Sequence, residues 1–541
     1  METVGKGVLG TWVGGPDDES SAGSELTQKV AAIVRERLDV LENRSTLSLQ
    51  QKLIIARLCY YPTMNHLLRT LHPAVGVDGA REFDSALFSS VLRWIGDSSL
   101  TCPGNLQKTR DIFSLPLRLG GLGFMSQAEI KPAAAGARLI LCQATLRERG
   151  LSCSRRLATR YSDAIQLCAS NLNLPVEDVL LDVNAQQAQL QRRVTQVVHE
   201  RNWLQSFSRL DSQEDRSRRL EALGPLARSW VSLIPTDLSL ALSNDDMRFG
   251  LRALLLSPFS DAHPTSPSNV CERCLDRPDG NRPCPLGHFL SCRANQVLIT
   301  HRHNAIKKSL LVWFQQVYKT AVVMEEVPLG TFINANNAPQ QVIGDIQVVG
   351  VGSGPNQDYD IGVTTVRNKE GRLVNWATDQ EVDAAILAQP ERRSNRWDLG
   401  DGTSNNSDEA IHPDTKRLRM FRQLAWEAAV LPHIREMHDR KVAHYRRAHV
   451  SGLKPLVFTA MGSISSTTRD TLHQLVFSSC PLEEVQARAE FRRRLFGRLG
   501  VLLVKYGRMT HQDQRRFFLS HNGIRGGMDG IVAGNHGVLV H

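Results

Sequence analysis

Four residues whose side chains bind soft metal ions stand at a spacing typical of a closed zinc site. They follow the pattern C-x2-C-x13-H-x3-C and are Cys271, Cys274, His288 and Cys292. A two-residue spacer curls the backbone so that two thiolates reach one ion, and His and Cys four positions apart lie on one helix face. Cys284, between two prolines, is an alternative ligand. The spacing predicts a zinc knuckle that separates two different parts of the chain.

The composition favours a protein of a reducing compartment without a membrane span. The 541 residues hold ten cysteines, and four of these are grouped at metal spacing, which argues against a disulfide framework. No apolar run approaches the roughly 18 residues of a membrane span, and the first residues lack the layout of a signal peptide. The length is sufficient for several domains.

The positive charge of the chain favours a polyanionic partner. The formal net charge is +10, and arginine clusters carry much of it. Guanidinium groups match phosphate oxygens, although any single cluster is also compatible with a solvated helix face. The positions expected to contact nucleic acid are Arg192, Arg193, Arg492, Arg493 and Arg494, with Arg302 and His303 after the knuckle.

Upstream of the knuckle the pattern is helical. Apolar residues recur at helical spacing from Glu25 to about Leu71 and again from Phe83 to Trp94, and residues 145–260 are rich in Arg, Gln and Leu. In this last stretch Trp203 and Phe207 are predicted to face a core, and base stacking is the alternative. Residues 261–270 have the composition of a linker.

Downstream of the knuckle the pattern changes to strands that carry carboxylates. A helix is expected over 305–318, followed by strands over 321–324, 342–349 and 359–364. Asp345 and Asp360 would lie on neighbouring strands and converge on Mg²⁺ or Mn²⁺, with a nearby lysine to stabilise developing charge. Asp358 is an alternative to Asp360, and Glu325 and Glu326 could add a further acid. Surface aspartates that close strands remain the alternative for the pair.

Four segments occur in a distinctive order in the first part of the chain: Val8-Leu9-Gly10, residues 51–69, Phe83-Asp84 and Leu115-Pro116 to Gly120-Gly121-Leu122-Gly123. In this order they resemble the thumb region that follows the palm in reverse transcriptases of non-long-terminal-repeat retrotransposons. The resemblance implies a helical thumb that grips a template–primer duplex. The polymerase carboxylates are not expected here, because Asp17-Asp18 and Asp245-Asp246 lack the aromatic residue and flanking strands of that family and are interpreted as helix caps or loop charges.

The second part resembles the restriction-like endonuclease at the carboxyl end of site-specific retrotransposons, which has a PD-(D/E)xK fold. The matching features are the knuckle, His301-Arg302-His303-Asn304, the two aspartates, the helix with Lys441 and the strand 455–462. The resemblance implies Asp345 and Asp360 as metal ligands and Lys441 as the catalytic lysine. Gly344 stands where the family usually has proline, Gly362 excludes the lysine from its usual strand position, and residues 391–415 look like an insertion.

The expected fold is multidomain, with an α-helical amino-terminal half, a small zinc knuckle and an α/β nuclease domain. The expected divisions are a thumb-like region (1–140), a helical linker (141–268), the knuckle (269–304), the endonuclease (305–480) and a basic helical extension with a flexible tail (481–541). The resemblance implies DNA nicking for target-primed reverse transcription, structural Zn²⁺, DNA and RNA as partners, a separate polymerase-containing protein and a nuclear location. The alternatives are a catalytically inactive or host-adopted nucleic-acid-binding protein and a zinc-dependent structural protein.

Overall fold

The computed structural model describes most of the chain outside the central loops and the ends. The described residues are 6–8, 11–13, 16–71, 75–96, 103–132, 134–135, 149–150, 190–257, 288–290, 292–351, 356–366, 413–480 and 484–521, with a few isolated positions between 162 and 170. The molecule is mostly helical with a four-stranded mixed sheet, as the sequence predicts for the coarse fold class. No helix of the described part is long and apolar enough to cross a bilayer.

The amino-terminal part is a stack of helices behind a short hairpin of β1 (Lys6–Val8) and β2 (Thr11–Val13). The long helix α1 (Pro16–Asn43) packs along α4 (Val77–Ile95). Between them lie α2 (Leu49–Ile55), a π-helical turn (Ala56–Tyr60), a 3-10 turn (Tyr61–Met64) and α3 (Asn65–Thr70). Ser48 caps α2 in a capping box with Gln51, which satisfies two orphan backbone donors.

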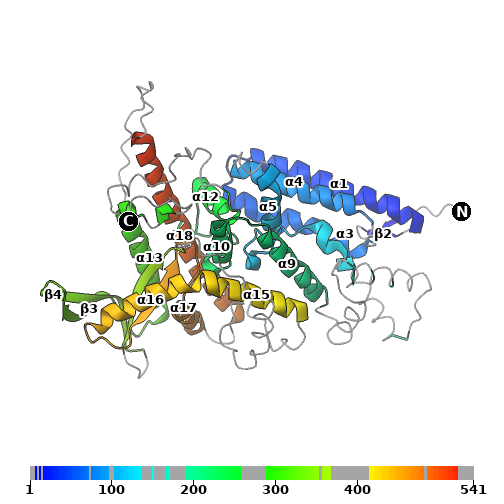
Figure 1. Cartoon of the computed structure of the whole chain (residues 1–541). Coiled ribbons are helices and arrows are strands. Elements are labelled where there is room, and N and C mark those ends of the chain that lie inside the picture. The colour runs from blue at the N-terminus through cyan, green and yellow to red at the C-terminus, as the bar shows by residue number, and fades with distance from the viewer. Residues whose placement is uncertain are drawn as a thin grey trace.

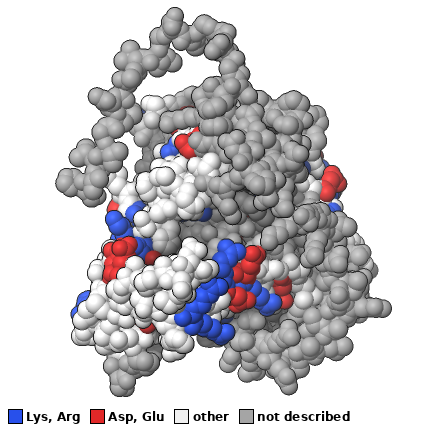
Figure 2. Space-filling model, turned by 60° about the vertical axis from the view of Figure 1, so that its left-hand side comes forward, with Lys and Arg blue, Asp and Glu red and all other residues white. Residues whose placement is uncertain are grey.

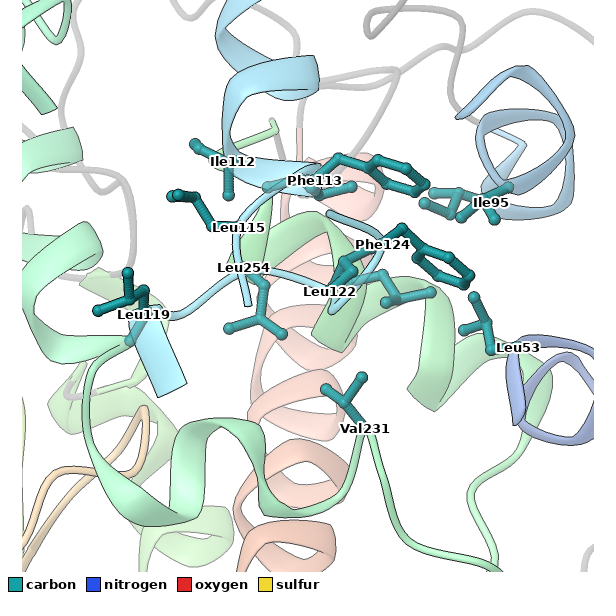
Figure 3. Packing of buried hydrophobic residues seen from close by; sticks show 14 of the residues in the cluster. Leu53, Ile95, Ile112, Phe113, Leu115, Leu119, Leu122, Phe124, Val231 and Leu254 are labelled. Carbon is teal, nitrogen blue, oxygen red and sulfur yellow. The ribbon is translucent and has the colours of Figure 1, made fainter. Parts of the chain in front are cut away.

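The glycine-rich segment after α5 (Pro103–Phe113) joins the two helical regions of the chain. Figure 3 shows Leu115, Leu119, Leu122 and Phe124 from this segment beside Leu53, Val231 and Leu254. The chain can turn this tightly because residue 121 is glycine. A Cβ at this position would lie 2.0 Å from the Leu115 carbonyl oxygen. The buried Arg219 guanidinium donates to the carbonyl oxygens of Leu119 and Gly120 at 2.6 and 2.7 Å. The segment is therefore part of the core.

The second helical region consists of α9 (Leu190–Ser208), α10 (Gln213–Glu221), α11 (Pro225–Ser229) and α12 (Asn244–Leu254). Trp203 and Phe207 on α9 are 1% and 0% exposed, and their rings stack with centroids 4.8 Å apart. The prediction that they face a core is confirmed, and buried rings are not accessible for base stacking. Ser243 and Asp246 form the capping box of α12, which confirms the helix-cap interpretation of Asp246.

The α/β part begins with two 3-10 turns (His288–Leu290 and Arg293–Asn295) and α13 (Gln296–Val317). The strands are β3 (Val322–Ile333), β4 (Pro339–Val349), β5 (Gln357–Thr364) and β6 (Lys454–Thr459), in the order β3-β4-β5-β6. Neighbouring strands are antiparallel except for the parallel pair β5–β6. That parallel pair requires a crossover. The described part of the crossover holds α15 (Pro413–Ala429) and α16 (Leu431–Arg446).

Two carboxyl-terminal helices complete the molecule. After β6 come α17 (Ser466–Ser479) and the long helix α18 (Val485–His521), which forms the predicted helical extension. Helix α18 runs from the sheet past α12 in Figure 1 and packs against α11, α12 and α13. Gly497 and Gly500 inside α18 allow close contact with Leu233 and Ser229.

The helical and α/β parts share one hydrophobic cluster. Trp426, Val457 and Val501 belong to the same cluster as Trp203 and Trp230. The loop after β6 touches α11 so closely that a Cβ at Gly462 (φ +108°) would lie 2.2 Å from the backbone nitrogen of Ala227. A side chain there would be strained as well as obstructed. The change of element type that the sequence predicts is present. Both parts contribute to this cluster, and the sheet also packs a second cluster that holds Ile346, Tyr359 and Leu456.

Candidate active site

Two strands bring Asp345 and Asp360 together at the middle of the sheet. β4 and β5 pair antiparallel from Ile346↔Tyr359 to Val348↔Gln357, so Asp345 and Asp360 stand at the end of this paired stretch. Oδ2 of Asp345 accepts a 2.6 Å hydrogen bond from the backbone N–H of Ile361, the residue after Asp360. This bond fixes one carboxylate against the strand that carries the other. The structure brings the two carboxyl groups together, as the sequence predicts.

The two carboxyl groups compete for ionisation. Burial favours the neutral form of Asp345, but the hydrogen bonds of its side chain with His303 and Asp360 outweigh burial and lower its pKa. Burial raises the pKa of Asp360 to about 7, and the neighbouring Asp345 adds to this while Lys441 opposes it. Two acids this close do not both ionise easily without a cation. The site therefore favours binding of positive charge.

Lys441 reaches this pair from helix α16. Its Nζ donates to Oδ2 of Asp360 at 2.7 Å, and both side chains are largely buried. The stem of Lys441 passes over Gly362 of β5, where a Cβ would lie 2.8 Å from Cε of the lysine and 3.0 Å from Cγ of Met437. Glycine at position 362 therefore leaves the space through which a lysine from the helix enters the site.

His303 is a fourth member of the site, and it comes from α13. Its Nε2 lies 3.1 Å from Oδ1 of Asp345. The carboxylate of Asp345 is thereby held at both oxygens, by His303 on one side and by Ile361 on the other. The sequence predicts contact with nucleic acid for this histidine, and the structure places its ring against Asp345.

One turn further along α13, Lys307 engages the two glutamates of β3. Its Nζ lies 2.9 Å from Glu325 and 2.5 Å from Glu326, and its side chain is 3% exposed. Glu326 has φ +54°, which is uncommon for a residue with a side chain. The further acid that the sequence suggested at Glu325 or Glu326 is thus paired with a lysine.

Asp358, the alternative to Asp360, lies outside this arrangement. Its Oδ1 accepts a 2.7 Å hydrogen bond from the Gln347 amide on the neighbouring strand. Asp358 and Asp360 are two apart on β5, and Asp360 contacts Lys441 whereas Asp358 contacts Gln347. The geometry therefore favours Asp360 as the partner of Asp345.

The predicted zinc ligands fall largely outside the described residues. Cys271, Cys274 and the alternative Cys284 are not described. His288 begins a 3-10 turn, and Cys292 is 0% exposed next to the buried Leu290. Among the described residues alone, no three His, Cys, Asp or Glu side chains are grouped so that they could hold a metal ion. The zinc knuckle stays a prediction.

The arginines expected to contact nucleic acid occupy different environments. Arg302 is 1% exposed and donates to the carbonyl oxygen of Leu290 at 3.3 Å, so the expected surface contact is wrong for this residue. It turns inward because it lies near the buried carboxylate of Glu221. The side chains of Arg192 and Arg193 on α9 lie outside the described residues.

The cluster on α18 is accessible, although its members have partners. Arg492 lies over the ring of Phe496, Arg493 pairs with Glu490 and Arg494 lies 3.5 Å from Asp237. Figure 2 shows Lys and Arg side chains next to Asp and Glu side chains over one face of the molecule. The positive charge of this face is therefore partly neutralised by neighbouring acids.

Known proteins offer no guide to the role of this site. Neither the protein-family models nor the curated sequences that were compared match the chain.

The donor set fits a hard divalent cation. Mg²⁺ commonly uses one or two carboxylates and completes its shell with water and substrate phosphate oxygens. Asp345 and Asp360 supply the two carboxylates. Burial and the neighbouring Asp345 raise the pKa of Asp360 although Lys441 opposes this, and a bound cation would favour the ionised form of both acids.

Proposed function

We propose that the chain is a divalent-metal-dependent DNA endonuclease from the carboxyl-terminal part of a retrotransposon-type reverse transcriptase. The observation that supports this most directly is the convergence of Asp345, Asp360 and Lys441 from β4, β5 and α16. Their order along the chain and their strand, strand and helix positions agree with a PD-(D/E)xK nuclease. The proposed product is a nick with a 3′ hydroxyl that primes reverse transcription.

Each residue of the candidate site has a separate role in this proposal. Asp345 and Asp360 bind Mg²⁺ or Mn²⁺, which would neutralise a phosphate oxygen and lower the pKa of a bound water. Lys441 donates from its Nζ toward the negative charge that develops on the phosphate. His303 and the Ile361 N–H hold Asp345 in one orientation.

The remainder of the chain serves the same reaction in our proposal. The helices of residues 16–135 grip a nucleic-acid duplex, the residues around Cys271 to Cys292 hold structural zinc, and a separate polymerase-containing protein supplies reverse transcription. DNA and RNA are the proposed partners, and the nucleus is the proposed location. Helix α18 packs against α11, α12 and α13, and α12 in turn contacts α2 and α4, so these contacts would join the duplex-gripping helices to the nuclease part.

Nicking of supercoiled plasmid tests the proposal. The full chain with Mn²⁺ or Mg²⁺ should convert plasmid to the open circle, and Asp345→Asn should reduce the rate by at least about a hundredfold, since a metal ligand is lost. Asp358→Asn is the matched control, because Asp358 bonds to Gln347 and its loss should change the rate by less than about threefold.

Equal nicking by wild type and Asp345→Asn would reject the assignment of the site. If the wild type does not nick but binds DNA with an affinity that the metal leaves unchanged, the catalytically inactive nucleic-acid-binding alternative is favoured.

A further inference from the structure

The hairpin of β3 and β4 extends past the candidate active site as a two-stranded ribbon. Its strands pair with each other as far as Ile333↔Pro339, whereas β4 pairs with β5 only from Ile346 to Val348. The ribbon lies at the edge of the molecule in Figure 1, beyond α13. At about 3.3 Å per residue, its tip lies roughly 20 Å along the strand from Asp345.

The ribbon is anchored at its base and ordered at its tip. Val342 packs with Tyr445 and Ala448, and the Tyr445 hydroxyl donates to the carbonyl oxygen of Ile343 at 2.6 Å. At the tip, Oδ1 of Asn334 accepts from the backbone N–H groups of Asn336 and Ala338 at 2.9 and 3.1 Å. A loop held in this way presents its side chains with little loss of conformational entropy on binding.

The ribbon carries no charged side chain. Between Glu326 and Asp345 the sequence contains no Lys, Arg, His, Asp or Glu, although the chain as a whole has a net charge of +10. Its exposed positions include the amides Asn336, Asn337, Gln340 and Gln341 and the apolar Ile333 and Ile343. The side chains of these four amides form no hydrogen bond with another described residue. The amides are therefore available to a partner.

Charged groups begin where the ribbon ends. Arg446 and Arg447 are exposed at the end of α16, directly before Ala448, which anchors the ribbon. Lys441 lies on the same helix, one turn before Tyr445, and contacts Asp360. Exposed cations thus stand at the base of a strip of neutral amides, and this pattern complements a duplex, in which phosphates line a groove floored by neutral base edges.

We infer that the β3–β4 ribbon enters the major groove of the duplex DNA that the site nicks and contacts base edges there. This inference rests on the proposed function. A two-stranded ribbon fits a major groove about 12 Å wide and 8.5 Å deep, and Asn and Gln pair with adenine through two hydrogen bonds. The exposed Ile333 and Ile343 match the methyl groups of thymine. The ribbon thereby selects the position at which the carboxylates meet the backbone.

Photocrosslinking tests the contact without depending on cleavage. The full chain carries p-benzoylphenylalanine at position 336 and is irradiated with a labelled duplex DNA, a duplex RNA of the same sequence, or no nucleic acid. The same group at Val322, which is 58% exposed at the opposite end of β3 from the tip, is the matched control. We expect a DNA crosslink from position 336 at least about tenfold stronger than from position 322.

The outcomes separate this inference from the proposed function. A crosslink to DNA supports the ribbon contact whether or not the plasmid is nicked. Crosslinking only to RNA or only to a second copy of the chain, or equal crosslinking from both positions, overturns it. If the plasmid is nicked in an Asp345-dependent manner and position 336 gives no crosslink, the proposed nuclease is supported and the ribbon contact is rejected.

A second variant tests selection of the cleavage position. Gln340→Ala with Gln341→Ala removes two amides from paired strand positions and leaves the tip bonds of Asn334 in place. The positions of the nicks on a plasmid should spread, with the preferred site losing about five- to a hundredfold over the background sites, the range expected for a lost base contact. An unchanged map of nick positions in a folded variant would overturn the role of the ribbon in selection.

Discussion

The side chain of Lys441 on α16 lies directly over Gly362 on β5, with Cε 2.8 Å from the position that a Cβ of residue 362 would take. The missing side chain on the strand and the lysine on the helix are therefore complementary. The lysine amine reaches Asp360 only because residue 362 leaves the space open.

This complementarity predicts the result of moving the lysine. Lys441→Ala and Gly362→Lys should each reduce nicking by at least about a hundredfold, the first by loss of the amine and the second by collision with the Lys441 stem. The double variant removes the collision and returns an amine to the sheet, so it should recover at least about tenfold over either single variant. The plasmid-nicking rates of the wild type, the two single variants and the double variant form a double-mutant cycle. Strictly additive losses would show that the two positions are not coupled.

His303→Ala should weaken Mn²⁺ binding rather than the fold. The histidine orients Asp345 through one hydrogen bond, and loss of such a support commonly costs about 10- to 100-fold in metal affinity. Titration calorimetry with Mn²⁺ alone measures the affinity, and thermal unfolding without metal reports stability. His301→Ala, at an exposed position of the same helix, is the matched control. Equal Mn²⁺ affinity in both variants would contradict the support role.

Glu221 should make stability depend on pH. It is buried between α10 and the loop after β6, where it accepts from the backbone N–H of Met461 at 3.1 Å and lies near Thr459, Arg218 and Arg302. Burial is the largest cause and raises its pKa from the usual 4.5 to about 7. The folded state therefore holds this proton more tightly than the unfolded state.

The sign of the effect follows from that difference. The contribution of Glu221 to stability is fully present below pH 4.5 and is lost as pH rises to 7. Relative to wild type, Glu221→Gln should gain roughly 3 kcal/mol of unfolding free energy between pH 4.5 and 8. Urea unfolding of both proteins across this range measures the gain. A difference that does not change with pH would refute it.

The zinc prediction has a direct chemical test. Metal analysis of the purified chain should find zinc, and Cys274→Ser should lower its content by at least about half because a thiolate ligand is lost. Cys59→Ser, at an exposed cysteine of the π-helical turn, is the matched control and should retain zinc. A zinc-free wild type, or the same zinc content in both variants, would exclude the knuckle.

The sequence by itself determined which segments form helices and strands around the candidate site. Apolar patterns predicted β4, β5 and α13, since local side-chain spacing sets which face each element can bury. The same patterns predicted that Trp203 and Phe207 would be core residues. The resemblance predicted the helix α16. The resemblance supplied Lys441, which spacing alone does not single out from other lysines.

Only the tertiary structure decided which of these side chains meet. Arg302 and His303 are neighbours in sequence, yet one turns toward buried Glu221 and the other toward Asp345, because consecutive residues of a helix point about 100° apart. Asp358 and Asp360 lie on the same face of β5, so the choice between them depends on where along the strand Lys441 of α16 arrives. The passage of Lys441 over Gly362 depends on the approach of that helix. These are contacts between elements far apart in the chain, and local patterns contain no information about their packing.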